Sequence, residues 1–412
     1  MNPYLIIILV LLVADYLLSL VVEWLNLAAA TEVLPPEFEG WYQPEEYARS
    51  QEYLKVTTRF GLLTGTVSTV LTLGFIVAGG FGWVDQFARG FGLGTVLTGL
   101  VFAAVLGLAM TVLGIPGSAW RTFVIEERFG FNKTDLPTFI LDLAKGVVIG
   151  SILGAMVFGG LVWFFDTAGR WAWYLSWVAI TVFQLFVMYL APVIIMPLFN
   201  KFTPLEDGPL KTAILDYATA HQFKLKGVFT MDGSKRSSKA NAFFTGFGRF
   251  RRIVLFDTLV EKHEVDELVA ILAHEMGHFK KQHITKHIIL SVLETGMMLF
   301  LLSLFIKSQP LAEAFGVEQA SVYAGIIFFG FLYSPLSTVL HTATNVLSRK
   351  FEYEADAYAA ATTGKTEALV DGLKRLTVDN LGNLTPHPLK VFLEYSHPPV
   401  SSRIQALREG SD

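Results

Sequence analysis

One short segment of the chain has residue types and spacing that favour metal-dependent hydrolysis. It reads His274, Glu275, Met276, Gly277, His278. On a helix, His274 and His278 lie one turn apart on the same face, so both imidazoles can reach one ion. Glu275 projects beside them and can accept a proton from a water that the metal acidifies. Because the preceding run has helical periodicity, we expect two zinc ligands, His274 and His278, and a general base, Glu275.

The third ligand must come from elsewhere in the chain. The extended metzincin pattern places Gly and His three and six residues after the second histidine, and this chain has Lys281 and Ile284 there. The alternative is a carboxylate on a second helix. Glu352 and Asp356 are spaced at i and i+4, so Glu352 can bind the metal while Asp356 accepts the outer N–H of a ligand histidine. Glu354, on another face of that helix, is the weaker choice.

Each of these segments also has a plainer interpretation. The helix of the first motif would be a surface helix with two satisfied histidines, and the second segment would be a charged, solvated helix. We expect His283 and His287 to continue the first motif's helix as interfacial histidines rather than ligands. The role of His341 stays open, and three further histidines are expected at the surface: His221, His263 and His387.

Composition limits both the class of protein and the choice of ligands. Of the 412 residues, 52% are hydrophobic and 17% are charged, whereas soluble domains carry roughly 25% charged residues. The composition therefore favours a membrane protein. The net charge of −4 gives no indication of nucleic-acid binding. The absence of cysteine excludes disulfides, thiolate metal sites and cysteine nucleophiles, so a metal must be held by histidine and carboxylate.

Seven stretches are long and apolar enough to cross a membrane as helices. Asp15, Glu23 and Glu294 lie within them, and intramembrane acids usually face a bundle interior or a water-filled cavity. The first stretch is too long for a signal-peptide core and is expected to be retained. The predicted spans are 4–27, 60–84, 93–115, 146–165, 172–198, 287–306 and 320–343.

The distribution of basic residues predicts the orientation. The loops 85–92, 166–171 and 307–319 share one side of the membrane and hold only three of the 32 Lys and Arg residues. The other side holds nearly all the rest, so the positive-inside rule places it in the cytosol. The N-terminus is therefore expected outside and the C-terminus inside. Spans six and seven leave the cytosolic side and return to it, which brings both motifs to that face.

The expected fold is mainly α, a polytopic seven-helix membrane bundle with a small α+β zinc protease domain on the cytosolic side. In 199–286 we expect a helix near 208–222, strands near 226–232, 239–245 and 251–257, a Gly-Phe-Gly hairpin turn at 246–248, and a helix from about 264. The expected segments are 1–198 with five spans, 199–286 and 344–412 as two parts of the catalytic domain, and 287–343 with two spans.

Together with the two motifs, several further segments resemble the CAAX prenyl protease 1 family of seven-span membrane zinc endopeptidases of gluzincin type. The resemblance implies a helical bundle enclosing a water-filled chamber, capped by the protease domain, with one Zn²⁺ per chain. It implies that Asn241 and Ala242 lie on an edge strand that pairs with an extended substrate peptide. It also implies that His397 and Arg403 face the scissile carbonyl. The resembling segments are 127–133, 192–200, 238–248, 252–259 and 397–399, followed by Arg403.

The partners and the location follow from these expectations. We expect an integral membrane protein of a bacterial inner membrane that acts on an extended peptide or protein, with or without a lipid. The lipid is left open because bacterial hosts generally make no farnesylated CAAX proteins. One alternative is a quality-control protease for membrane proteins. The other, from a different class, is a transporter or channel with a structural zinc site, in which Asp15, Glu23 and Glu294 form the pathway.

Overall fold

The computed structural model describes residues 2–245 and 252–410. Within these residues, seven helices are long and apolar enough to cross a membrane, as the sequence predicts. Their spans are Pro3–Ala29, Pro44–Val77, Thr95–Glu126, Leu136–Thr167, Gly169–Phe199, His283–Phe305 and Val322–Thr363.

The second spanning helix begins much earlier than the predicted range of 60–84. Helix α2 runs over Pro44–Val77, and its start is set by a capping box between Gln43 and Glu46. Helix α2 ends at Val77, and Gly79 adopts a left-handed conformation with φ at 71°. The chain then turns, and Gly80–Arg89 forms the separate helix α3. The segment 44–59, predicted as a loop, was missed because its polar residues lie outside the apolar stretch that marks the span.

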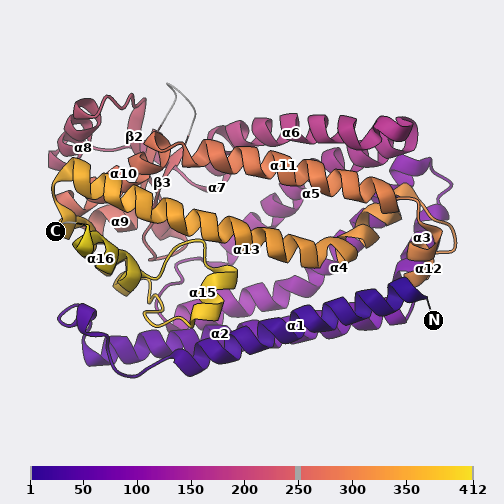
Figure 1. The fold of residues 1–412 in the computed structure, drawn as a ribbon, viewed down its shortest axis with the longest axis horizontal. Coiled ribbons are helices and arrows are strands. Elements are labelled where there is room, and N and C mark those ends of the chain that lie inside the picture. Colours follow the sequence, from indigo (N-terminus) through magenta and orange to yellow (C-terminus); the bar gives the residue numbers. More distant parts are fainter. Residues whose placement is uncertain (1, 246–251, 411–412) are drawn as a thin grey trace.

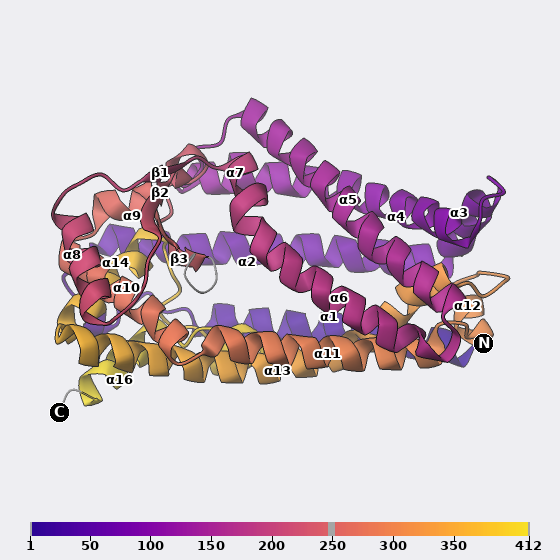
Figure 2. The same ribbon diagram turned by 90° about the horizontal axis from the view of Figure 1, so that it is seen from above.

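The spanning helices run along the long axis of the molecule (Figure 1). They are α1 (Pro3–Ala29), α2, α4 (Thr95–Trp120), α5 (Leu136–Thr167), α6 (Ala172–Leu190), α11 (His283–Phe305) and α13 (Val322–Thr363). The N-terminus, α3 and the short helix α12 (Gln309–Ala314) lie at the end opposite the sheet (Figures 1 and 2). Aromatic side chains pack together at that end, where the ring centroids of Phe315 and Phe328 are stacked 4.0 Å apart.

The membrane part is an open arrangement of helices rather than a solid bundle. A compact monomer of this length exposes about 16,000 Å², whereas this chain exposes 21163 Å². The apolar window of α2 is only 6% buried, and that of the span Gly169–Phe199 is 0% buried. These helices are therefore accessible on most of their circumference. The water-filled chamber that the family resemblance implies would account for this area excess.

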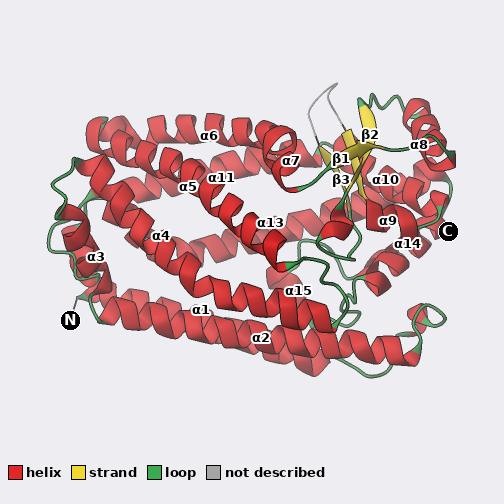
Figure 3. Ribbon diagram, turned by 180° about the vertical axis from the view of Figure 1, so that it is seen from behind, coloured by secondary structure: helices red, strands yellow, loops and turns green. Residues whose placement is uncertain are grey.

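The described chain forms one four-stranded sheet with the order β1-β2-β4-β3, at the end of the molecule opposite α3 (Figure 3). Strands β2 (Gly227–Met231) and β4 (Arg252–Phe256) pair in parallel, and β3 (Ala242–Thr245) pairs antiparallel with β4. These strands confirm the predicted α+β segment, and β1 (Phe202–Pro204) is additional. The predicted turn at 246–248 lies outside the described residues.

Five further helices pack with the sheet and form one unit with it, the sheet domain. They bury a common core that includes Ile214, Leu255, Leu268 and Met276. The helices are α8 (Pro209–Ala220), α9 (Asp257–Lys262), α10 (Val265–Lys280), α14 (Thr366–Asp379) and α16 (Val400–Glu409). Helix α15 (Pro388–Glu394) lies between this group of helices and the C-terminal half of α1 (Figure 1), where Lys390 pairs with Glu23.

The bounds of helices α13 and α10 determine where the residues of the two sequence motifs lie. Helix α13 has 42 residues, about 63 Å at 1.5 Å per residue, and continues from the membrane part into the sheet domain, with Pro335 inside it. Helix α10 instead ends at Lys280, and Gln282 adopts a left-handed conformation with φ at 59° before α11 begins at His283. The prediction that His283 and His287 continue the first motif's helix was therefore wrong.

Candidate metal centre

Helices α10 and α13 bring together three side chains that could hold a metal ion: His274, His278 and Glu352. The Nε2 atoms of the two histidines lie 3.1 Å apart. Glu352 Oε2 lies 3.4 Å from His274 Nε2, and Glu352 Oε1 lies 3.3 Å from His278 Nε2. Sequence positions almost 80 residues apart thus meet at one point, as the two motifs predict.

The two helices can approach this closely because Gly277 faces α13. A Cβ atom at Gly277 would lie 3.0 Å from Ala355 Cα and 3.1 Å from Ala355 O. Helix α10 begins with a capping box between Glu264 and Glu267. Glu267 also pairs with Arg375 of α14, at 2.9 Å. The helix that carries both histidines is therefore fixed at its start and packed at its centre.

Behind His274 lies a buried ionic group made by Asp356 and Arg403. His274 Nδ1 is 2.8 Å from Asp356 Oδ1, as predicted for a carboxylate that orients a ligand histidine. Arg403 of α16 donates from Nε and Nη2 to the same carboxylate, at 2.8 and 2.6 Å. Its Nη1 lies 3.5 Å from Glu352 Oε2. Arg403 therefore lies at the site, with most of its hydrogen-bonding capacity directed at Asp356.

The electrostatics of the group favour a cation. Burial disfavours the charged form of His274, but the Asp356 and Glu352 carboxylates outweigh it and raise the pKa of the imidazole to about 9. Glu352 Oε2 is buried and makes no hydrogen bond within the described chain. Two carboxylates and one guanidinium sum to one negative charge, which a proton on His274 balances and which a bound ion would balance in place of that proton. The residues present therefore fit a metal ion.

The proposed base packs near β3, the strand proposed to pair with substrate. Residues from β3, β4 and α10, among them Ala242, Phe244 and Glu275, line a narrow apolar crevice that is too small for a water molecule. Burial raises the pKa of the Glu275 carboxyl above its ordinary value. Asn241 precedes β3, and its carbonyl accepts a hydrogen bond from the Phe256 backbone at 3.0 Å. Among the described strands β3 pairs only with β4, so its other edge is available for pairing.

His397 lies on the open side of the metal centre. Its Nε2 atom is 3.4 Å from Glu352 Oε1, and its side chain is 65% exposed. Its Nδ1 atom is 3.0 Å from Ser396 Oγ. The exposed ring, unlike the buried guanidinium of Arg403, is therefore free to contact a bound substrate.

The contacts of His278 beyond the metal centre were not predicted. Its Nδ1 atom is 3.1 Å from Nδ1 of His283, whose Nε2 atom is 3.1 Å from Glu354 Oε2. Both partners were considered as metal ligands and ranked low, but their spacing from the motifs could have suggested a supporting role. His263, predicted at the surface, is buried at 7% exposure, 3.0 Å from Glu267.

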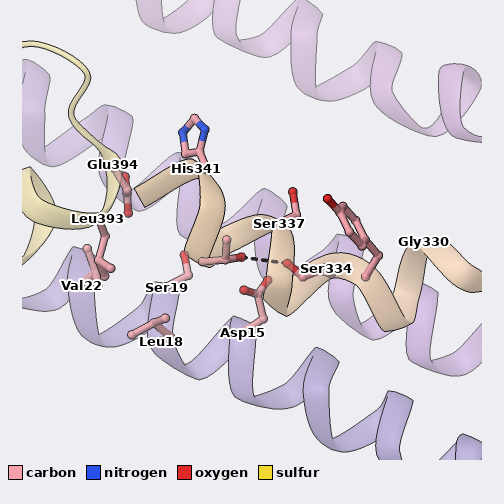
Figure 4. A pocket seen from close by; sticks show the side chains of 12 residues that line it. Asp15, Leu18, Ser19, Val22, Gly330, Ser334, Ser337, His341, Leu393 and Glu394 are labelled. Atoms are coloured by element: carbon pink, nitrogen blue, oxygen red, sulfur yellow. Dashed lines mark hydrogen bonds between the residues drawn. The ribbon is translucent and has the colours of Figure 1, made fainter. Parts of the chain in front are cut away.

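The three intramembrane acids do not form one pathway. Glu23 pairs with Lys390 at 2.7 Å, and Glu294 accepts a hydrogen bond from Thr344 at 3.1 Å. Asp15 lines a cavity of about 520 Å³ between α1, α13 and α15 (Figure 4). This position agrees with the expectation that intramembrane acids face a cavity. None of the three proposed metal ligands, His274, His278 and Glu352, lines this cavity. Its other polar lining residues include Ser19, Ser334, Ser337 and His341.

Two protein-family models match consecutive parts of the chain. Residues 23–201 match the CAAX prenyl protease N-terminal model, described as five membrane helices, and residues 204–411 match peptidase family M48. The chain belongs to peptidase family M48. It is therefore a membrane-embedded metalloprotease, and the resemblance to CAAX prenyl protease 1 is confirmed.

Individual relatives match over nearly the whole chain. The probable CAAX prenyl protease 1 of Schizosaccharomyces pombe is 37% identical over 380 residues, covering 88% of this chain and 79% of that protein. The human CAAX prenyl protease 1 homolog is 32% identical over 424 residues, covering 92% and 89%. The crystal structure of S. mikatae Ste24p superposes with a TM-score of 0.94 at 31% identity, covering 99% of both chains. These relatives are from yeasts and a mammal, so they do not support the expectation of a bacterial source.

Proposed function

We propose that this metalloprotease is a zinc endopeptidase that holds one Zn²⁺ with His274, His278 and Glu352. The observation that carries the proposal is the spacing of the three donor groups. Tetrahedral ligands at zinc bond lengths of about 2.05 Å are separated by about 3.3 Å. The three closest donor pairs here are separated by 3.1, 3.3 and 3.4 Å. Two imidazoles and one carboxylate are also the donor set of catalytic zinc sites that keep a fourth position for water.

The chemistry divides between the ion and the side chains. A bound Zn²⁺ would acidify a water and polarise the peptide carbonyl. Glu275 accepts the proton of the attacking water at its carboxylate and delivers it to the leaving amine nitrogen. His397 donates a hydrogen bond to the developing oxyanion, a contact worth on the order of 3 kcal/mol. Arg403 holds Asp356 and lies near Glu352, so it also contributes positive charge to the same region.

The substrate is an extended peptide that adds a strand to β3 at Asn241 and Ala242. Pairing with an edge strand supplies main-chain hydrogen bonds and presents the scissile bond to the metal centre. Two of the relatives are named CAAX prenyl proteases, which indicates prenylated CAAX proteins as the substrates of those relatives. We propose the same substrate class for this chain. Cleavage of a prenylated peptide and of its unlipidated form separates this class from general quality-control proteolysis, for which the two rates would be equal.

The proposed orientation places the catalytic end in the cytosol and the N-terminus outside. Arg89, Arg170 and Lys307 belong to the connections at the end that bears α3 and α12, opposite the sheet (Figure 1). The remaining basic residues concentrate toward the catalytic end, as the positive-inside rule requires. Labelling of single cysteines introduced into this cysteine-free chain, in intact cells, tests the orientation directly.

The assignment of the base is tested with Glu275→Gln in the purified full-length chain. The amide cannot accept the proton, so turnover should fall by a factor of roughly 10² to 10⁴. The zinc content should stay at about one per chain, because Glu275 is not among the ligands. A Glu275→Gln variant with full peptidase activity would show that another group is the base.

A further inference from the structure

The ligand histidine His278 has a chain of two side chains behind it that the proposed mechanism does not use. Its Nδ1 atom faces Nδ1 of His283 at 3.1 Å, and Nε2 of His283 faces Glu354 Oε2 at 3.1 Å. His283 is the first residue of α11 and is 1% exposed. Glu354 lies on α13, two residues after Glu352. Three helices therefore meet in this chain of contacts.

Ligation of a metal fixes where the protons lie. A neutral imidazole that gives Nε2 to a metal carries its proton on Nδ1, so His278 donates through Nδ1. Two ring nitrogens 3.1 Å apart share a single proton, so His283 accepts at its Nδ1. The proton of His283 is then on Nε2, where it is donated to the Glu354 carboxylate. Every hydrogen-bonding atom of the two rings thus has a partner of the right kind.

We propose that His283 is a positioning residue of the metal site, which accepts the outer N–H of His278 and donates its own to Glu354. This inference rests on the proposed zinc ligation. It makes the two ligand histidines equivalent, since His274 reaches the Asp356 carboxylate directly and His278 reaches the Glu354 carboxylate through one imidazole. A carboxylate behind a ligand histidine fixes the ring orientation and raises its basicity toward the metal.

The surroundings of His283 hold the ring in the orientation that this role requires. Its ring stacks on Phe351 with centroids 4.1 Å apart and planes 5° from parallel. The left-handed Gln282 creates the sharp turn between α10 and α11 that returns His283 to His278. Three residues close in sequence on α13 thus have separate roles. Phe351 stacks on the His283 ring, Glu352 is the proposed metal ligand, and Glu354 accepts the hydrogen bond from His283.

Two substitutions of His283 separate hydrogen bonding from packing. His283→Phe keeps an aromatic ring against Phe351 and removes the acceptor, whereas His283→Asn keeps an acceptor near the Nδ1 position and removes the ring. The readout is the zinc dissociation constant of the purified full-length chain in detergent, measured by competition with a chromophoric chelator. We expect His283→Phe to weaken zinc binding about 10- to 100-fold, and His283→Asn to weaken it less. A role in packing alone predicts the reverse order.

Two further variants complete the test. His287→Phe is the matched control, because His287 lies one turn further along α11 and contacts Phe351 edge-on without touching a ligand. It should bind zinc as the wild type does. Glu354→Gln should weaken binding less than His283→Phe, and the double variant should bind no more weakly than His283→Phe alone, since the contacts act in series.

The failure of this inference can be told apart from the failure of the proposed function. A wild-type chain that binds about one zinc, with His283→Phe binding it equally tightly, would overturn the positioning role and leave the zinc assignment intact. A wild-type chain that binds no zinc would overturn both. An affinity order in which His283→Asn is weaker than His283→Phe would assign His283 to packing.

Discussion

The spacing of the two ligand-bearing helices depends on the absence of a side chain at Gly277. In Gly277→Ala, the added Cβ would lie 3.0 Å from Ala355 Cα and 3.2 Å from Tyr358 Cβ. Ordinary carbon contacts are about 3.5–4.0 Å. The two helices must therefore separate by roughly 0.5 Å at this point. Ala355 directly precedes Asp356 and lies one turn from Glu352, so the displaced backbone carries a metal ligand with it.

The magnitude follows from the cost of overpacking, which is about 1–3 kcal/mol for an added methyl group in a packed interior. Zinc–ligand distances hold to within about 0.2 Å, so the site cannot absorb a larger movement without loss. If all the strain falls on the metal site, the zinc dissociation constant rises by about 5- to 150-fold. Chelator competition on the purified chain measures this rise, and thermal unfolding measures any strain released elsewhere.

The matched control is Gly150→Ala on α5, where an added Cβ meets nothing within 4 Å. The same chemical change in a helix interior should there stabilise the protein by roughly 0.5–1 kcal/mol and leave zinc affinity unchanged. The reasoning is refuted if Gly277→Ala matches Gly150→Ala in both zinc affinity and unfolding temperature, because the contact with Ala355 would then not set the helix spacing.

Three further predictions concern the supporting charges and the metal. Asp356→Asn should weaken zinc binding about 10- to 100-fold and destabilise the fold by roughly 3–5 kcal/mol, because the buried Arg403 loses the carboxylate that accepts its two short hydrogen bonds and keeps only Glu352 at 3.5 Å; unchanged binding would contradict the assigned role. Removal of zinc by a chelator should lower the unfolding temperature, and zinc at 1,000 times its dissociation constant should restore about 4 kcal/mol. Burial disfavours the Glu37 carboxylate, but ion pairs with Lys374 and Arg408 hold its pKa below the ordinary value. Its stabilisation is thus complete above the ordinary pKa and is lost as the pH falls through the lowered one. The unfolding-temperature difference between wild type and Glu37→Gln should therefore shrink on acidification, and a constant difference would be evidence against the ion pairs.

The features set by local chemistry were predictable from the sequence. The seven spans follow from apolar length, and the grouping of His274, His278 and Glu352 follows from helical spacing together with a topology that returns both motifs to one face. The roles of Glu275 and of the substrate strand stay predictions, which Glu275→Gln and the prenylated and unlipidated peptides test. The strands of the catalytic domain were found because β-branched and aromatic runs mark them.

Features that depend on tertiary contacts were not predictable in the same way. The polar first half of α2 has no apolar signal, and its helical state shows only in the capping box at Gln43. The helix break at Gln282 depends on a left-handed residue that is not glycine, for which the sequence gives little warning. The contact between His278 and His283 depends on that break. A single continuous helix through both residues does not predict this contact.

The unbroken course of α13 ties the chemistry to the lipid environment. A spanning helix adjusts its tilt when the hydrocarbon thickness changes, and Glu352 lies on the same continuous helix, α13, whose apolar part can span the membrane. The imidazoles lie on α10, which is a separate helix within the water-exposed domain. A change in the tilt of α13 would therefore act first on the Glu352 carboxylate, whereas the two imidazoles are held by a different helix.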